Sequence, residues 1–289
     1  MIRYPATLDS LRERIKDEVP GWLASARRKT GRFRKLKRYS EESPTWSEVK
    51  PVFMELQRAK CAYCERKLEE GDIGKIEWDV EHFRPKSAVT RWPPRSQTVE
   101  FAFPLGPASQ TGYYLLPYHP LNYLASCKVC NSPLKGDYFP IGARRRRLTG
   151  SDPRKLVTEQ PYLIYPIGDF DDDPESLLSF QGFLCVPVAD RGERRRRALV
   201  TIAFFRLNDR DTLLKERAQL ILGTWVMLQR READPADNIS REYIEAIGTP
   251  GFRHANCARS FLRTYEQDRE LARTFVERAR EYCQSKGGC

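Results

Sequence analysis

Four cysteines have the spacing best suited to metal chemistry in this sequence. Cys61 and Cys64 form one Cys-x-x-Cys turn, and Cys127 and Cys130 form a second. Each turn can offer two thiolates to one tetrahedral ion, and four-cysteine sets are typical of zinc. Because four thiolates leave no open position for a substrate, the pattern predicts a structural zinc ion. The other four cysteines follow no ligand spacing.

The segment between the two cysteine pairs contains a carboxylate followed directly by a histidine. Residues 75–86 (KIEWDVEHFRPK) predict a strand that carries Glu81 and His82. Since the pKa of an unperturbed histidine is about 6.5, His82 can accept a proton near neutral pH. Asn131 follows the second cysteine pair directly, and Lys135 lies in the same stretch.

Four segments in this order, CAYC, EHFRPK, LNYLASC and CNSPLKG, connect these residues to a known family. They resemble the ββα-metal, or HNH, endonucleases in their four-cysteine zinc version, over residues 61 to about 140. The resemblance implies two strands and a helix around one divalent catalytic ion. It also implies that His82 is the general base, that Glu81 and Asn131 bind the ion, and that Asn122 braces the loop between the strands.

The chemistry of phosphodiester hydrolysis is consistent with these residue types. The reaction requires an activated water, neutralisation of charge in the transition state and help for the leaving 3′ oxygen. His82 is suited to activating the water. A hard ion such as Mg²⁺ or Mn²⁺ prefers oxygen ligands, which Glu81 and the Asn131 side-chain carbonyl provide.

Three assignments in this region stay open. Asp79 can replace Glu81 as a ligand, because residues two apart on a strand point to the same face. Lys135 occupies a place where many relatives carry a histidine ligand, and it either contacts the scissile phosphate or caps a short helix. His119 lies beside the segment that contains Asn122, where we expect packing or phosphate contact rather than catalysis.

Basic residues outside the cysteine region predict contacts to a phosphate backbone. Residues 27–38 hold eight Lys and Arg and no acidic residue, and residues 143–155 form a second basic loop. Neutralised phosphates release condensed counterions, which favours binding. A solvated basic face is the alternative. The predicted nucleic-acid contacts are Arg84, Lys86, Arg32, Arg34, Lys35, Arg144 and Arg145.

The fold class expected from these patterns is α+β, a mainly helical chain around a small zinc-stapled ββα-metal module. We expect three regions: a basic helical one at 1–58, the nuclease module at 59–140 and a C-terminal one at 141–289. Prolines at 89–111 indicate an insertion loop in the module. In the last region, short strands at 162–167 and 180–188 precede helices at 208–230 and 255–284.

Composition narrows the classes of partner. The 289 residues include 50 Lys and Arg against 39 Asp and Glu, a formal net charge of +11 that favours a polyanion such as DNA. No stretch approaches the roughly 18 to 20 apolar residues that would span a bilayer. We therefore expect a soluble, cytoplasmic protein, in which reduced cysteines bind metal rather than form disulfides.

A weaker resemblance extends past the module, through PYLIYP at 161–166, DPE at 173–175 and LN at 207–208. These positions are similar to larger HNH proteins found with retrons and in Septu-type anti-phage systems, where the nuclease works beside an ATPase of the ABC or SMC-like kind. Two alternatives stay open: a zinc-dependent nucleic-acid-binding module without catalysis, and an adaptor whose C-terminal helices dock a partner. Only catalysis requires His82, Asn122 and Asn131 together.

Overall fold

The chain divides into two compact units, and each is described by itself. The computed structural model describes residues 1–69, 71–74, 76–145 and 152–287. The N-terminal unit comprises 3–63 and 68–173, and the C-terminal unit comprises 1–2, 64–67 and 174–289. This division differs from the three expected regions. The N-terminal helices belong with the predicted nuclease module, and the boundary lies at 173/174 rather than 140/141.

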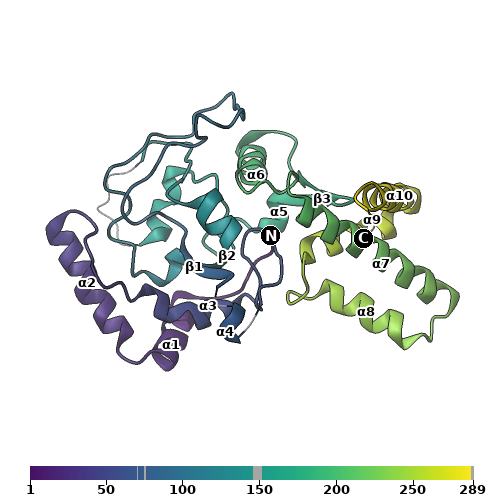
Figure 1. Cartoon of the computed structure of the whole chain (residues 1–289), viewed down its shortest axis with the longest axis horizontal. Coiled ribbons are helices and arrows are strands. Elements are labelled where there is room, and N and C mark those ends of the chain that lie inside the picture. The colour runs from purple at the N-terminus through teal and green to yellow at the C-terminus, as the bar shows by residue number, and fades with distance from the viewer. Residues whose placement is uncertain (70, 75, 146–151, 288–289) are drawn as a thin grey trace. The chain divides into compact units, whose positions relative to one another are not determined.

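The N-terminal unit combines short helices with one two-stranded sheet (Figure 1). Its elements are α1 (Leu8–Glu18), α2 (Trp22–Leu36), η1 (Trp46–Val49), α3 (Lys50–Leu56), α4 (Gly71–Gly74), β1 (Trp78–His82), η2 (Pro120–Asn122), β2 (Tyr123–Cys127), η3 (Cys130–Lys135) and η4 (Pro153–Glu159). Long stretches between β1 and β2 form neither helix nor strand, as expected for the proline-rich insertion at 89–111.

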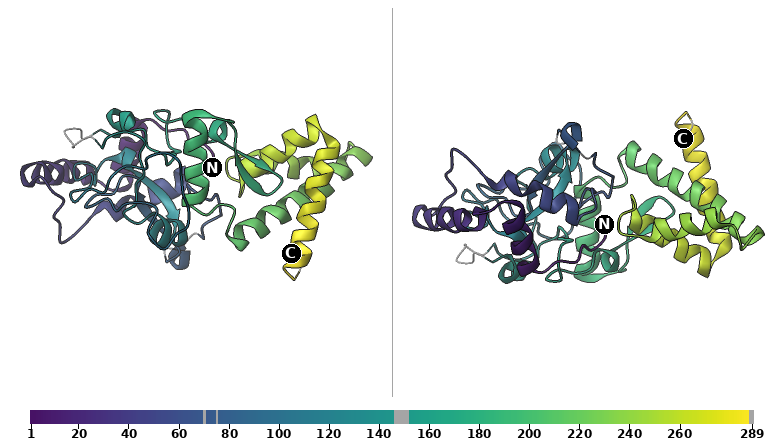
Figure 2. Two further views of the ribbon diagram at one scale, coloured as in Figure 1. Left: turned by 90° about the horizontal axis from the view of Figure 1, so that it is seen from above. Right: turned by 90° about the horizontal axis from the view of Figure 1, so that it is seen from below.

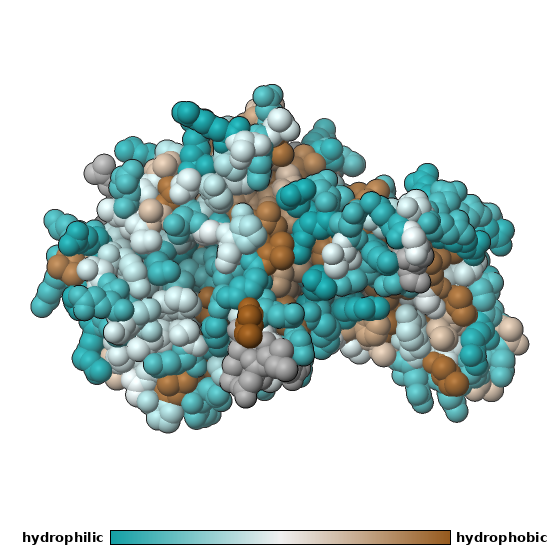
Figure 3. All heavy atoms as spheres, in the orientation of Figure 1, coloured by the Kyte–Doolittle hydropathy of each residue, from teal (hydrophilic) through white to brown (hydrophobic). Residues whose placement is uncertain are grey.

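Capping and amphipathic spacing account for the first two helices. Thr7 caps α1 by accepting a hydrogen bond from the Ser10 backbone, and the Ser10 side chain accepts one from the Thr7 backbone. In α1 the apolar residues Leu11 and Ile15, four apart, are buried. The basic side chains Arg32, Arg34 and Lys35 of α2 are exposed. Figure 3 shows a mostly hydrophilic surface where α2 lies.

The C-terminal unit is built from longer helices around one β-hairpin (Figure 2). Its elements are α5 (Pro174–Leu177), β3 (Leu178–Gln181), β4 (Leu184–Pro187), α6 (Gly192–Phe204), α7 (Asp211–Ala233), α8 (Asn238–Gly248), α9 (Ala255–Gln267) and α10 (Arg269–Ser285). Helix α7 packs against α8, α9 and α10. Its apolar face, which includes Leu214, Ala218 and Ile221, is buried.

The architecture confirms a mixed, helix-dominated class with small antiparallel sheets. The predicted strand at 180–188 matches the β3–β4 hairpin, and the helix expected at 255–284 is divided at Asp268, which caps α10. The strand predicted at 162–167 is wrong. Those residues form only an isolated bridge between Ile167 and Tyr4, because Pro161 and Pro166 lack the N–H that a ladder requires. No helix in the described ranges is long and apolar enough to cross a membrane.

Candidate active site

A two-stranded antiparallel ribbon positions the carboxylate and the histidine. β1 pairs with β2 so that Glu81 lies opposite Leu124 and His82 lies opposite Tyr123. β2 runs into the second cysteine pair, and η3 follows directly with Asn131 in its first turn. Glu81 and His82 therefore lie at the end of the ribbon where β2 begins, and η3, which follows the other end of β2, returns so that Lys135 contacts Glu81.

The four predicted zinc ligands form one buried cluster. The sulfur atoms of Cys61, Cys64, Cys127 and Cys130 all lie within 4.8 Å of one another. Four zinc–thiolate bonds of about 2.3 Å around a tetrahedral ion put the sulfur atoms about 3.8 Å apart. The sequence prediction that these cysteines gather is confirmed, and the cluster can hold a metal ion such as zinc.

Gln57 ties the first cysteine turn to the sheet, and nothing in the sequence singled it out. Its amide nitrogen donates to the carbonyls of Lys60 and Ala125, both at 2.9 Å, and its oxygen accepts from the Ala125 N–H at 2.7 Å. The Ala62 N–H also donates to the Ala125 carbonyl at 3.0 Å. These bonds hold the turn against β2 by polar contacts that involve no metal.

The buried ring of His82 has one nitrogen committed to the backbone. Nε2 lies 3.1 Å from the carbonyl oxygen of Pro117. Because a carbonyl can only accept, Nε2 carries the proton, which leaves the lone pair of the neutral ring on Nδ1. Trp46 and Tyr123 contact the ring edge-on, with centroids at 4.9 and 5.2 Å. The ring is therefore fixed in both orientation and tautomer.

The surroundings of His82 also favour its neutral form. Burial and the positive charge of Lys86 hold the pKa of His82 well below its ordinary value, with a smaller contribution from Lys135. The hydrogen bond to Pro117 opposes this shift only in part. At neutral pH the imidazole is uncharged, which is the state in which a histidine accepts a proton.

Lys135 is buried against Glu81. Its side chain is 0% exposed, and its Nζ lies 3.2 Å from Oε1 of Glu81 and 3.3 Å from the carbonyl of Gly136. Burial raises the pKa of Glu81 to about 7, and the Lys135 charge opposes that rise. The ammonium therefore serves the adjacent carboxylate and the carbonyl of Gly136, the residue that ends η3, and contact with a scissile phosphate stays a prediction.

Asn131 lies nearest to Asp79, the alternative carboxylate. Its amide nitrogen is 3.3 Å from Oδ2 of Asp79. Lys50 lies 2.7 Å from Oδ1 of Asp79, and Lys128 pairs with Oδ2. These two cations hold the pKa of Asp79 below its usual range against the effect of burial. Sequence reasoning missed Lys50, because its position in α3 gives no local signal of a partner on β1.

One cavity of about 250 Å³ collects these groups. The charged groups, the histidine and the amide in its wall are Asp79, Glu81, His82, Lys86, Asn131 and Asp137. Glu81 and Asp79, the two alternative metal ligands, both line this cavity, as expected for residues two apart on a strand. Carboxylate and amide oxygens are suited to a hard divalent ion, so the donor set fits Mg²⁺ or Mn²⁺.

Asn122 braces the chain that leaves β1. It is 0% exposed, its oxygen accepts from the Arg84 N–H at 2.8 Å, and its nitrogen donates to the carbonyls of Arg84 at 3.1 Å and Leu116 at 3.2 Å. The side chain therefore fixes the backbone two residues after His82. His119 is nearby, where its Nδ1 accepts from the Leu121 N–H at 3.1 Å, a capping role in η2.

Two arginines predicted to contact nucleic acid form bonds within the protein, Arg84 buried and Arg145 half-buried. The Arg84 guanidinium is 2% exposed, bonds Glu159 at 2.5 Å and donates to the Leu156 carbonyl at 2.9 Å. Arg145 donates to the Tyr113 hydroxyl at 2.5 Å and to backbone carbonyls. These bonds correct the prediction for Arg84, whose charge the fold encloses, whereas contact between Arg145 and nucleic acid stays a prediction.

The other residues predicted to contact nucleic acid have charged groups that are at least partly accessible. Arg144 is exposed, and of the loop 143–155 only 143–145 and 152–155 belong to the described residues. Lys86 is half-buried over the ring of Trp46, at 5.2 Å. Arg34 lines a cavity of about 780 Å³. The other charged residues that line this cavity are Arg12, Arg27, Asp152, Arg154 and Lys155.

Comparison with known proteins adds one relative. The chain is 28% identical to the Septu protein PtuB of Bacillus mycoides (strain KBAB4) over 198 residues. The match covers 68% of this chain and 58% of the relative, so this chain spans less than two thirds of that protein's length. No protein-family model matches the sequence, and no solved structure matches it. This similarity supports the interpretation that the chain is a component of a Septu-type defence system.

Proposed function

We propose that this protein is a metal-dependent HNH endonuclease that hydrolyses phosphodiester bonds of DNA. The observation that carries the proposal is the geometry around His82. Its Nε2 is committed to the Pro117 carbonyl, which directs the Nδ1 lone pair to other partners, while Glu81 and Asn131 line the same cavity. A protein that only bound nucleic acid would need no such arrangement.

The roles follow from the positions of the groups. His82 is neutral and takes the proton of the attacking water at Nδ1. Glu81 and Asn131 would hold Mg²⁺ or Mn²⁺, and Asp79 is the alternative to Glu81. Such an ion, when bound, neutralises charge that develops on the phosphate. Lys135 balances the buried Glu81 carboxylate, and Asn122 keeps the backbone after His82 in place.

The cysteine cluster would have a structural role in this mechanism. Four thiolates complete the coordination of zinc, so no position is left for a substrate. The cluster joins the turn before β1 to the turn after β2, on either side of the proposed catalytic residues. Zinc would therefore maintain the distance between the base and the oxygen ligands.

The similarity to the Septu protein PtuB supports a role in anti-phage defence in the cytoplasm. We propose that the nuclease acts with an ABC or SMC-like ATPase as its partner, as the sequence resemblance implies. The exposed arginines and lysine of α2 would contact the phosphate backbone of DNA.

A plasmid-cleavage experiment tests the proposed activity. Purified protein is incubated with supercoiled plasmid and Mg²⁺ or Mn²⁺, beside His82→Ala and His119→Asn. The second variant is a matched control, because asparagine keeps an acceptor for the η2 cap while removing an imidazole. We expect His82→Ala to lose cleavage by about 10²- to 10⁴-fold and His119→Asn to retain it. Equal cleavage by all three proteins, or none with either metal, would contradict the proposal and favour a binding or adaptor role.

A further inference from the structure

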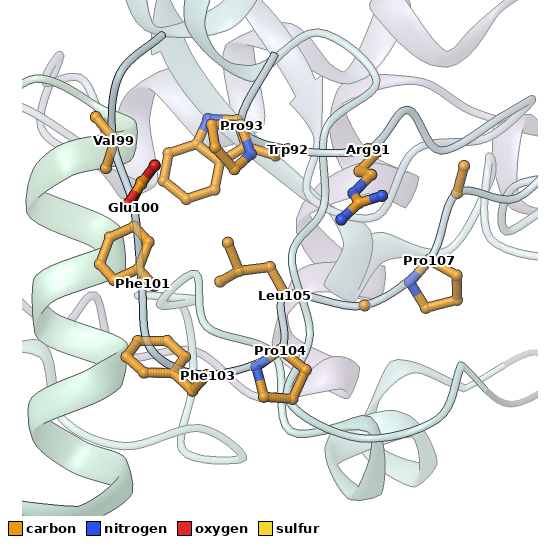
Figure 4. A pocket seen from close by; sticks show the side chains of 12 residues that line it. Arg91, Trp92, Pro93, Val99, Glu100, Phe101, Phe103, Pro104, Leu105 and Pro107 are labelled. Carbon is orange, nitrogen blue, oxygen red and sulfur yellow. The ribbon is translucent and has the colours of Figure 1, made fainter. Parts of the chain in front are cut away.

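The insertion loop lines a third cavity, of about 830 Å³, that the proposed chemistry does not use. Figure 4 shows side chains from both limbs of the loop arranged around a common open space. Three aromatic residues, Trp92, Phe101 and Phe103, form much of its apolar wall. Arg91 and Glu100 add one positive and one negative group. Its size is within the range of pockets that bind small organic groups.

Contacts within and around the loop hold this cavity in shape. Val89 and Ser109 exchange backbone hydrogen bonds of 2.7 and 2.8 Å, which close the loop at its base. The ring of Phe101 lies between those of Trp92 and Phe103, with centroids at 5.8 and 5.1 Å. Trp92 is 3% exposed, whereas Phe101 and Phe103 are half-buried. The pocket therefore has a fixed base and aromatic surface that a ligand can reach.

One glycine allows the loop to lie close to the rest of the unit. Gly106 has a φ of +77°, and a Cβ at that position would lie 2.5 Å from Cγ1 of Ile141. The Ile141 N–H donates to the Leu105 carbonyl at 3.1 Å. The returning limb is thus fixed to the unit by a contact that requires the absence of a side chain.

The loop is also joined to the wall of the active-site cavity. The Thr90 N–H donates to the Asp137 carbonyl at 3.0 Å, and the Tyr113 N–H donates to the Pro85 carbonyl at 2.8 Å. Pro85 and Asp137 both line the active-site cavity. A group bound in the loop is therefore held by a segment whose two ends are attached beside the proposed catalytic residues.

The chemistry of the lining fits one class of ligand best. Aromatic side chains stack on the flat faces of nucleobases, and each base adds substantially to affinity in this way. Glu100 and Arg91 line the same cavity, where a carboxylate can accept hydrogen bonds from base N–H groups and a guanidinium can pair with a phosphate. An aliphatic peptide side chain would use the apolar wall but would leave both charged groups without a role.

We propose that the insertion loop binds a single unstacked base of the nucleic acid that the active site cuts, with preference for guanine. Guanine presents two adjacent N–H donors, which match the two oxygens of the Glu100 carboxylate. This inference rests on the proposed nuclease function and deepens it. It assigns recognition of the substrate to residues 89–111, away from the groups that do chemistry.

Binding measured without cleavage tests the inference. His82→Ala protein, with zinc bound and no Mg²⁺ or Mn²⁺ added, is titrated with three short phosphodiester strands. Each strand lacks bases except at its central position, which carries guanine in the first strand, thymine in the second and no base in the third, the base-free strand. Trp fluorescence reports binding, and a Trp92→Phe variant assigns the signal. We expect the guanine strand to bind about tenfold tighter than the base-free strand and to quench Trp92.

Two substitutions separate stacking from hydrogen bonding. Phe101→Leu keeps apolar volume but removes the ring face, so it should reduce affinity for the guanine strand while leaving that for the base-free strand unchanged. Glu100→Gln should narrow the difference between guanine and thymine. Val226→Ala, an exposed residue of α7, is the matched control and should change neither affinity. Unchanged binding of the base-free strand shows that each variant is folded.

The outcomes distinguish this inference from the proposed function. Equal affinity for all three strands, or an unchanged guanine affinity in Phe101→Leu, would overturn base recognition even if the wild-type protein cuts plasmid. If the protein prefers guanine but cuts no plasmid, the base-binding inference holds and the proposed nuclease function is wrong.

Discussion

The active-site region and the insertion loop lie in the same unit but are built in opposite ways. Around the active site, the side chains of Glu81, His82, Asn122 and Lys135 are buried, and each has a polar partner in the protein. In the loop, the ring of Phe101 contacts those of Trp92 and Phe103, and Arg91 and Glu100 are exposed. Groups proposed for reaction are fixed before any ligand arrives, whereas the charged groups proposed for recognition are accessible.

This difference implies that substitutions in the two regions have different effects. Removing a buried polar partner leaves another group unsatisfied, which reduces stability. Removing an exposed side chain from a loop changes stability little. Four substitutions test this contrast, in decreasing order of expected effect.

The largest effect is expected for Cys127→Ser. Structural zinc contributes about 10 to 16 kcal/mol of apparent binding energy in small zinc modules, so losing one thiolate should release the ion and unfold β1 and β2. Metal analysis should fall from about one zinc per chain towards none, and hydrogen exchange should show loss of protection in residues 123–127. Cys185→Ala, a free buried cysteine outside the cluster, is the matched control. Full zinc occupancy in Cys127→Ser would remove the structural assignment.

Arg84→Met should be the most destabilising change that leaves the metal ligands intact. The guanidinium pairs with the 0% exposed Glu159, and breaking a buried ion pair costs about 3 to 5 kcal/mol. Urea unfolding measures this loss, and adding Glu159→Gln should restore part of it. DNA binding by the folded protein should keep its salt dependence. A reduction of the salt slope by about 1 would mean that Arg84 contacts phosphate after all.

Asn122→Ala should cost less stability but more activity. The change leaves the Arg84 N–H without its acceptor in a buried site, a loss of about 1 to 3 kcal/mol. Asn208 is a matched control, because it bonds both the N–H and the carbonyl of Cys185, each at 2.8 Å. If Asn122→Ala and Asn208→Ala lose equal stability and both retain plasmid cleavage, the brace has no role in positioning His82.

The smallest effect on stability is expected for Arg91→Ala, within about 0.5 kcal/mol. Loss of one phosphate contact should weaken binding to all three probe strands alike and reduce the salt slope by about 1. Arg278→Ala on α10, also exposed, controls for net charge. A loss of stability as large as that of Asn122→Ala would show that the loop is not an independent recognition element.

Local patterns were sufficient to predict part of this arrangement. The two Cys-x-x-Cys turns predicted the cysteine cluster, because each turn alone positions two sulfur atoms. The strand at 78–82 was predictable from the apolar residues Trp78 and Val80 alternating with Asp79 and Glu81. These features depend on a few neighbouring residues, so the sequence contains them directly.

Pairings between distant residues could not be predicted in the same way. Arg84 and Arg145 belong to basic stretches that resemble a nucleic-acid surface, but Glu159, the partner of Arg84, lies 75 residues away. Lys135 pairs with Glu81 on a different element. A sequence shows the charge of a side chain but not which distant group the fold brings to it, and partners distant in sequence engage all three.

The π-helical turn of η3 has a consequence for how this protein can evolve. Cys130 at its start belongs to the cysteine cluster, and Lys135 at its end pairs with Glu81. Ser132 and Pro133 between them are exposed. Selection should therefore act on the length of this segment more strongly than on its composition. Descendant sequences should accept replacements at 132 and 133, whereas a one-residue insertion or deletion would rotate Lys135 away from the carboxylate and be eliminated.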